Sequence, residues 1–128
     1  MLRSIHVHDC FKGSAAAILA TFSLSATITS TKKSLFFELL EIKPDVLVHI
    51  IPSYFPAFEQ LLFKTQIKFP LLPQVFITYH EWENKHVKIK DLFIPDATVV
   101  LSFAELTATR FIYAIMDAQD ATLPDKTN

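Results

Sequence analysis

The stretch KPDVLVHII, residues 43–51, decides how this chain is expected to fold. Residues 46–51 are continuously apolar except for His49, and such a run is typical of a strand buried on both faces of a parallel sheet. Pro44 disfavours helical backbone at Lys43, so a preceding helix is expected to end there. That helix is predicted to bury one apolar face, made of Leu35, Phe36, Leu39 and Leu40.

Strands and helices are predicted to alternate on both sides of this stretch. Strands are predicted where apolar residues alternate with polar ones or form short runs, over residues 4–9, 26–29, 46–51, 75–78 and 97–101. Helical segments are predicted between and after them, over residues 12–22, 31–40, 53–62, 81–90 and 103–116. This alternation predicts an α/β domain with a five-stranded parallel sheet and helices on both faces.

Composition excludes several classes of protein. The chain has 128 residues, of which 51% are hydrophobic, and a net charge of −1, so a single well-packed domain is expected and disorder is not. The near-neutral charge favours neither nucleic acid nor an anionic membrane as a partner. One cysteine, Cys10, excludes an internal disulfide framework, and one glycine, Gly13, excludes the GxGxxG and P-loop phosphate-binding motifs.

The domain is expected to span residues 1–118, and the polar residues 119–128 are expected to form a tail or linker. No apolar run is long enough to span a bilayer. Residues 15–24 resemble the apolar part of a signal peptide, but an expected strand and the acidic Asp9 precede them. We therefore interpret that segment as a helix and expect a cytoplasmic location.

Four short motifs occur in a familiar order: IHVHD at residues 5–9, LLEIKPDVLV at 39–48, Thr78 at the end of the fourth strand, and DATVVLS at 96–102. Together they resemble the receiver domain of bacterial response regulators, over residues 4–117. The resemblance is to the receiver that precedes the DNA-binding domain in LuxR-type transcription factors. It implies a flavodoxin-like, three-layer α/β/α sandwich with strand order 2-1-3-4-5.

The chain departs from that family at the phosphorylation pocket. An active receiver uses an acidic pair that holds magnesium, an aspartate that accepts the phosphoryl group, a Thr or Ser, and a lysine. The corresponding positions here are His8 and Asp9, then Ile50 (or His49 if the register slips by one), Thr78 and Ser102. Only Asp9 and Thr78 match the pattern. We therefore expect a non-enzymatic domain that cannot be phosphorylated on aspartate and has no cofactor.

The resemblance implies a regulatory module that forms homodimers or binds other regulatory proteins, in a two-component or transcriptional context. DNA would be contacted only through an absent C-terminal domain, and no membrane partner is expected. In the family, the face made by the fourth helix, fifth strand and fifth helix often carries the dimer contact. The residues of that face here are Trp82, Val87, Phe103, Phe111 and Tyr113. The alternative is that most of these side chains belong to the core.

Two other functions remain open. His8, His49 and His80 follow or end three neighbouring strands of the predicted sheet, beside Asp9, and three imidazoles with one carboxylate suit zinc. Cys10 could add a thiolate, which makes a metal or small-ligand sensor the first alternative. Against it, each histidine could simply fill a position that lost its acid. The second alternative is a stand-alone interaction adaptor.

Overall fold

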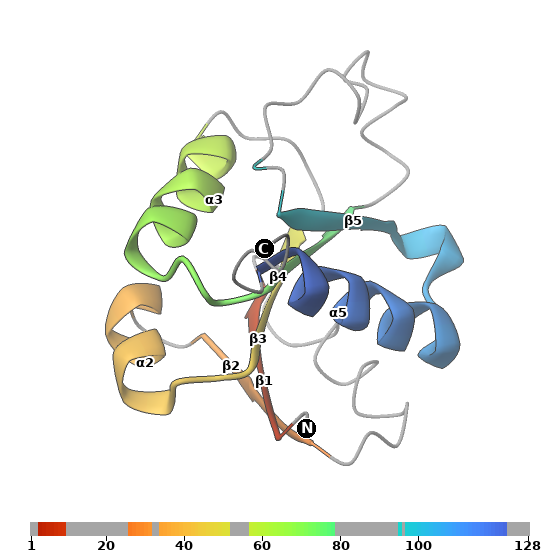
Figure 1. The fold of residues 1–128 in the computed structure, drawn as a ribbon, viewed down its shortest axis with the longest axis horizontal. Coiled ribbons are helices and arrows are strands. Elements are labelled where there is room, and N and C mark those ends of the chain that lie inside the picture. The colour runs from red at the N-terminus through yellow and green to blue at the C-terminus, as the bar shows by residue number, and fades with distance from the viewer. Residues whose placement is uncertain are drawn as a thin grey trace, which may run out of the picture.

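The computed structural model describes residues 3–9, 26–31, 34–51, 57–78, 95 and 97–122. Five strands form one parallel sheet in the order β2-β1-β3-β4-β5, which confirms the predicted α/β fold and strand order (Figure 1). The strands are β1 (Ser4–Asp9), β2 (Thr27–Ser30), β3 (Val46–Ile51), β4 (Gln74–Thr78) and β5 (Thr98–Ser102). The helices are α2 (Leu35–Ile42), α3 (Ala57–Lys68), the short 3-10 helix η2 (Phe103–Glu105) and α5 (Ala108–Thr122).

The helices cover both faces of the sheet, as in a flavodoxin-like sandwich. α5 lies on one side, and α2 and α3 lie on the other (Figure 1). We call the side under α5 the apolar face, because its described strand residues Ile5, Val7, Val46, Val48, Ile50, Val75, Ile77 and Leu101 form one buried cluster with α5. We call the opposite side the polar face, because it carries His6, His8, His49 and Gln74 beside Leu47 and Phe76. Strand residues alternate between the two sides, so each strand contributes to both.

The KPDVLVHII stretch folds as its residues predict. α2 ends when Lys43 adopts a left-handed backbone conformation (φ 49°, ψ 60°) and its N–H donates to the carbonyl of Leu39. After Pro44, one carboxylate oxygen of Asp45 accepts hydrogen bonds from the backbone N–H groups of Arg3 (2.6 Å) and Ser4 (3.0 Å). Asp45 thus joins the start of β3 to the start of β1 and helps to set the register of the two central strands.

The C-terminal helix differs from the prediction at both ends. Instead of a helix over 103–116, η2 comes first and α5 begins at Ala108, where the Thr107 hydroxyl accepts a hydrogen bond from the N–H of Arg110. α5 then continues to Thr122, so the first residues of the predicted tail are helical, and Ala118 is fully buried. The helix extends further because Ala118 packs against the sheet, a contact that polar composition after that position does not reveal.

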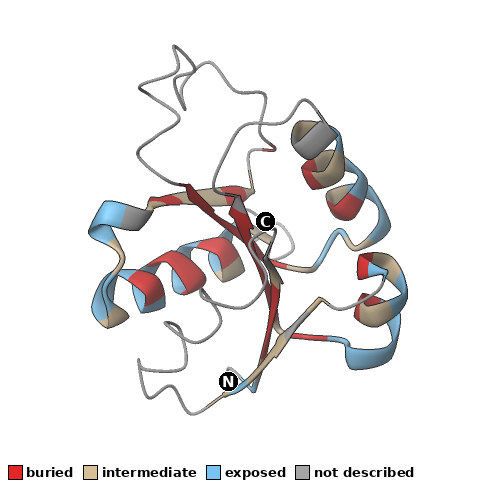
Figure 2. Cartoon of the chain, turned by 180° about the vertical axis from the view of Figure 1, so that it is seen from behind, coloured by how far each residue is buried: buried red, intermediate tan, exposed pale blue. Residues whose placement is uncertain are grey.

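The outer surfaces of the helices show a second difference. Leu35 and Leu39 of α2 are buried as predicted, but Leu40 is 59% exposed, because the sheet covers a narrower face of the helix than helical spacing predicts. Figure 2 shows the same arrangement for α5, where buried residues face the sheet and exposed residues point away. Within the described ranges, no helix is long and apolar enough to cross a bilayer. The helices predicted over 12–22 and 81–90 lie outside the described residues.

Candidate functional site

Two of the predicted site histidines meet on the polar face, near the carboxyl ends of β1 and β3. His8 and His49 are paired in the register of the two strands, and their Nδ1 atoms lie 3.2 Å apart. The two rings meet edge to face, with an interplanar angle of 87°. His49 is fully buried, whereas His8 is partly exposed. The parallel pairing brings together two side chains that are 41 positions apart in the chain.

A directed chain of hydrogen bonds holds this pair. The amide nitrogen of Gln74 donates to the Leu62 carbonyl of α3 (3.4 Å), which turns the Gln74 oxygen towards His49. His49 Nε2 therefore carries a proton and donates it to Gln74 Oε1 (2.8 Å). The His49 Nδ1 atom is then an acceptor, and His8 Nδ1 is the donor that faces it. This series of hydrogen bonds runs from α3 across β4 and β3 to β1, and it fixes the tautomer of both histidine rings.

Burial keeps His49 neutral. Desolvation, with a smaller effect from the neighbouring His8, lowers the pKa of His49 to about 3, against the opposing effect of the hydrogen bond to Gln74. The unprotonated Nδ1 atom of His49 is therefore present at every pH near neutrality. It can accept one proton donor or coordinate one metal ion, and His8 occupies the position opposite to it.

His6 forms a separate cluster at the β2 side of the polar face. It is not one of the histidines of the predicted site. Its Nδ1 lies 2.7 Å from the Thr29 hydroxyl, and its Nε2 lies 3.0 Å from the Thr31 hydroxyl and 3.4 Å from a carboxylate oxygen of Glu38. Burial lowers the pKa of His6, while Glu38 opposes that shift. The cluster ties β1 to β2 and α2, and its contacts are those of a structural residue.

The other predicted pocket residues do not all converge on this pair. Ile50 is fully buried on the apolar face, so its side chain points to the opposite side of the sheet from His49. Thr78 and Ser102 are paired across β4 and β5, and Thr78 is buried while Ser102 is partly exposed. Asp9 lies at the end of β1, opposite Ile50 in the register, and its side chain is outside the described part of the structure.

The remaining predicted residues divide between the core and the parts that are not described. Phe111 was an expected interface residue, but it is fully buried against the sheet, so the core alternative holds for it. Tyr113, by contrast, is 60% exposed. Trp82, Val87, His80 and Cys10 lie outside the described residues, as does the side chain of Phe103. Among the described residues, no three His, Cys, Asp or Glu side chains are grouped to hold a metal ion.

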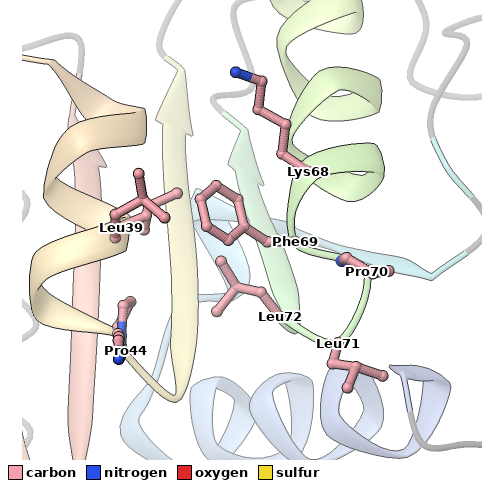
Figure 3. Close-up of a pocket in the computed structure, with 9 residues that line it drawn as sticks. Leu39, Pro44, Lys68, Phe69, Pro70, Leu71 and Leu72 are labelled. Atoms are coloured by element: carbon pink, nitrogen blue, oxygen red, sulfur yellow. The ribbon is translucent and has the colours of Figure 1, made fainter.

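A groove at the opposite end of the sheet was not found by sequence reasoning. It lies between the end of α2 and the loop that joins α3 to β4, and its volume is about 420 Å³ (Figure 3). Its lining residues are Leu39, Leu40, Lys43, Pro44, Lys68, Phe69, Pro70, Leu71 and Leu72. Phe69 and Leu72 point towards Leu39 across the groove. The sequence signal that could have indicated the groove is the loop at residues 69–73, which is more apolar than a surface turn needs to be.

Comparisons with known proteins support the fold and nothing finer. No family model matches the chain, and no curated protein matches it. The chain is similar in structure to a protein from Burkholderia pseudomallei described as pilus assembly-related, with a TM-score of 0.68 and 15% sequence identity. The match covers 96% of this chain and 93% of that one. At this identity the likeness shows a common fold.

Proposed function

We propose that this chain is a receiver-like regulatory domain that does not accept a phosphoryl group and that acts by binding a second copy of itself or another protein. The observation that supports this most is the residue at the tip of the central strand. Ile50 is buried in the apolar core, and the preceding His49 is buried, neutral and bonded on both ring nitrogens. Neither side chain offers a carboxylate oxygen to a phosphoryl donor or to magnesium.

In this proposal, the series of hydrogen bonds from Gln74 through His49 to His8 has a structural role. Magnesium and a reacting aspartate need open, negatively charged oxygen ligands, whereas the His8–His49–Gln74 chain fills the same region with oriented hydrogen bonds. A site occupied in this way is stable without an ion. The regulatory state of the domain then depends on its contacts with other molecules rather than on a kinase.

The biological setting is proposed at a coarser level. The resemblance to LuxR-type receivers favours transcription regulation, with DNA bound by a further domain. The structural neighbour described as pilus assembly-related favours a module that works within a protein assembly. Both settings require a protein-binding surface on this domain, and a stand-alone adaptor would require one as well.

The experiment that tests the loss of phosphorylation uses acetyl phosphate and magnesium. We expect the intact mass of the chain to stay unchanged, while an active receiver treated in parallel gains one phosphoryl group. Light scattering of the same sample, over a range of concentrations, tests self-association. A phosphoryl adduct on Asp9 or Asp45 would contradict the first part of the proposal, and a chain that binds neither itself nor any protein would contradict the second.

A metal sensor is the second candidate, and one distance favours it. Two nitrogen ligands of tetrahedral zinc, each about 2.0–2.1 Å from the metal, lie about 3.3–3.4 Å apart. The His8 and His49 Nδ1 atoms are 3.2 Å apart, and the Gln74 contact orients His49 as a ligand in the way that outer contacts of zinc sites do. Such a site would need further ligands, for which Asp9, Cys10 and His80 are the candidates named by the sequence.

Calorimetric titration with zinc tests this candidate. If the metal binds here, the wild-type chain should bind zinc at micromolar concentration and His8→Ala should lose most of that affinity. A His6→Asn variant is the matched control, since His6 lies on the same strand and belongs to a different cluster. Equal heats from all three chains, or no heat at all, would exclude zinc at this site.

A further inference from the structure

The groove of Figure 3 has the features of a docking site for an acidic, partly apolar helix. Its wall at α2 includes Leu40, and its wall at the α3–β4 loop includes Leu71, which is 69% exposed. The two charged side chains among its nine lining residues are both lysines, Lys43 at the C-terminal end of α2 and Lys68 at the end of α3. Both are exposed, so the groove offers an apolar floor between two cations.

Contacts with aromatic rings hold one of these cations in place. The Nζ atom of Lys68 lies 4.8 Å from the centre of the Phe36 ring, and Phe36 in turn stacks on Phe69 of the groove wall, with ring centres 6.4 Å apart. An ammonium group placed over an aromatic ring is attracted to the face of that ring, which limits the freedom of the side chain. The positive charge at this edge of the groove is therefore positioned by the fold.

The outer surface of α5 carries the complementary pattern. Ile112, Tyr113 and Met116 are 40%, 60% and 51% exposed, although all three are large and apolar or aromatic. Asp117 and Asp120 are exposed one turn further along the same side, since 113 and 117, like 116 and 120, are four positions apart. We call these five residues the α5 stripe. It is apolar in the middle of the helix and acidic towards its C-terminus.

Asp120, in the last turn of α5, is poorly placed for the helix by itself. The C-terminal end of a helix carries a partial negative charge, which disfavours carboxylates and favours cations there. The last turn of α5 has no basic residue. Cations supplied by another molecule would relieve this repulsion, and the lysines of the groove are of the required sign.

We propose that the α5 stripe of one copy of this chain docks in the groove of a second copy, with Asp117 and Asp120 facing Lys43 and Lys68. The apolar residues of the stripe then cover Leu40 and Leu71, as an amphipathic helix does in a groove. This inference rests on the self-association part of the proposed function, and it names the two surfaces that meet.

The positions of the two surfaces determine the kind of assembly. α5 packs on the apolar face, whereas the groove belongs to α2, α3 and the loop on the other side of the sheet (Figure 1). A copy whose α5 stripe is bound by one neighbour can still bind the α5 stripe of another neighbour in its own groove. Unlike surfaces that pair in this manner produce head-to-tail assemblies. The assemblies are therefore expected to become larger than a dimer as the protein concentration rises.

Charge reversal tests the pairing directly. The groove variant is Lys43→Glu with Lys68→Glu, and the stripe variant is Asp117→Lys with Asp120→Lys. The matched control is Lys64→Glu, which makes the same change on an exposed residue of α3 that does not line the groove. All of these residues are exposed, and circular dichroism checks that each variant is folded. Light scattering then measures the average mass of each chain across a range of concentrations.

We expect the wild type and the Lys64→Glu control to show a mass that rises with concentration. The groove variant alone and the stripe variant alone should each weaken association by about 100-fold or more, because like charges then face each other across the contact. An equimolar mixture of the two variants should associate again, and so should a single chain that carries all four reversals, because opposite charges then meet.

Failure of this inference can be told apart from failure of the proposed function. If the wild type associates but neither variant weakens it, or if the mixture and the four-reversal chain stay monomeric, the α5 stripe and the groove do not pair. Another surface then mediates self-association, and the proposed function stands. If the wild type is monomeric even at about 1 mM, where weak contacts would be populated, self-association itself is wrong.

Discussion

The two faces of the sheet are held by different interactions, although the same five strands supply both. On the apolar face, Val48 and Ile50 are fully buried among aliphatic side chains and the inner side of α5. On the polar face, His49 and Gln74 are buried to a similar degree, but each makes directed hydrogen bonds. The apolar face is stabilised by buried area, which tolerates some rearrangement. The polar face combines a smaller buried cluster of Leu35, Leu39 and Leu47 with these hydrogen bonds, which depend on each donor meeting its acceptor.

This difference bears on how polar residues near the carboxyl ends of the strands are interpreted. A cluster of polar residues at the end of a parallel sheet usually indicates a ligand site, because loops and strand ends converge there. Here the two described histidines of that cluster are hydrogen-bonded to each other, and His49 is also bonded to Gln74, so these side chains form a connected network. Among the described residues, exposed apolar surfaces such as the groove and the α5 stripe are at other places on the molecule.

The largest expected effect is on the apolar face. Replacing Phe111 by Ala should lower the free energy of unfolding by about 3–5 kcal/mol, because a fully buried ring is removed and leaves a cavity. Tyr113→Ala on the outer side of the same helix is the control, and it should change stability by less than about 0.5 kcal/mol. Urea unfolding at a concentration where the chain is monomeric measures both. Equal losses would mean that α5 does not pack as described.

An intermediate effect is expected on the polar face. Gln74→Leu should cost about 1–3 kcal/mol, because it leaves the buried Nε2–H of His49 without its acceptor. The double variant Gln74→Leu with His49→Phe should recover most of the loss, since both polar partners are then replaced by apolar groups. The same unfolding measurement tests this pair. A double variant less stable than the sum of both single changes would show that the network does not behave as one unit.

The smallest effect near neutral pH is the dependence of stability on pH, which amounts to less than about 1 kcal/mol between pH 7 and pH 6. The pKa of His49 is about 3 in the folded chain and about 6.5 when unfolded, so below pH 6.5 the unfolded chain binds a proton that the folded chain does not. Stability from this residue is therefore complete above pH 6.5 and falls as pH drops towards 3. The slope approaches about 1.4 kcal/mol per pH unit. The lowered pKa of His6 acts in the same direction.

Comparison of the wild type with His49→Asn isolates this contribution. Asn keeps a donor and an acceptor but does not titrate, so the stability difference between the two chains should shrink steadily between pH 6.5 and pH 5. Urea unfolding at several pH values measures it. A difference that stays constant over this range would mean that His49 is not held neutral by burial.

The class of fold could be predicted from local patterns, and the candidate site only in part. The alternation of apolar runs with helical segments was sufficient to predict a parallel sheet with helices on both faces, because right-handed crossovers favour that arrangement. The strand order came from the resemblance to receiver domains. The meeting of His8 and His49 was predicted, but not that Gln74 would orient them. Gln74 was outside the predicted strand, and its partner is a backbone carbonyl 12 positions away on α3.

The ends of the helices and the side-chain directions were harder to predict. The extension of α5 to Thr122 depends on Ala118 reaching the sheet, and the exposure of Leu40 depends on how much of α2 the sheet covers. Ile50 and His49 are neighbours in the chain, yet they point to opposite faces of the sheet. Because the alignment with the receiver pattern was uncertain by one residue, the sequence did not decide which of the two lies in the predicted pocket. Contacts between distant elements settled each of these points.

The sequence by itself determined the approximate positions of the five strands and the α/β class of the fold. These are properties of short segments, which each residue type influences directly through backbone preference and burial. Tertiary structure alone decided that Gln74 orients the histidine pair near one end of the sheet and that a groove with two lysines opens at the other. Both features join residues about 25 to 40 positions apart, and their geometry depends on how the helices pack against the sheet.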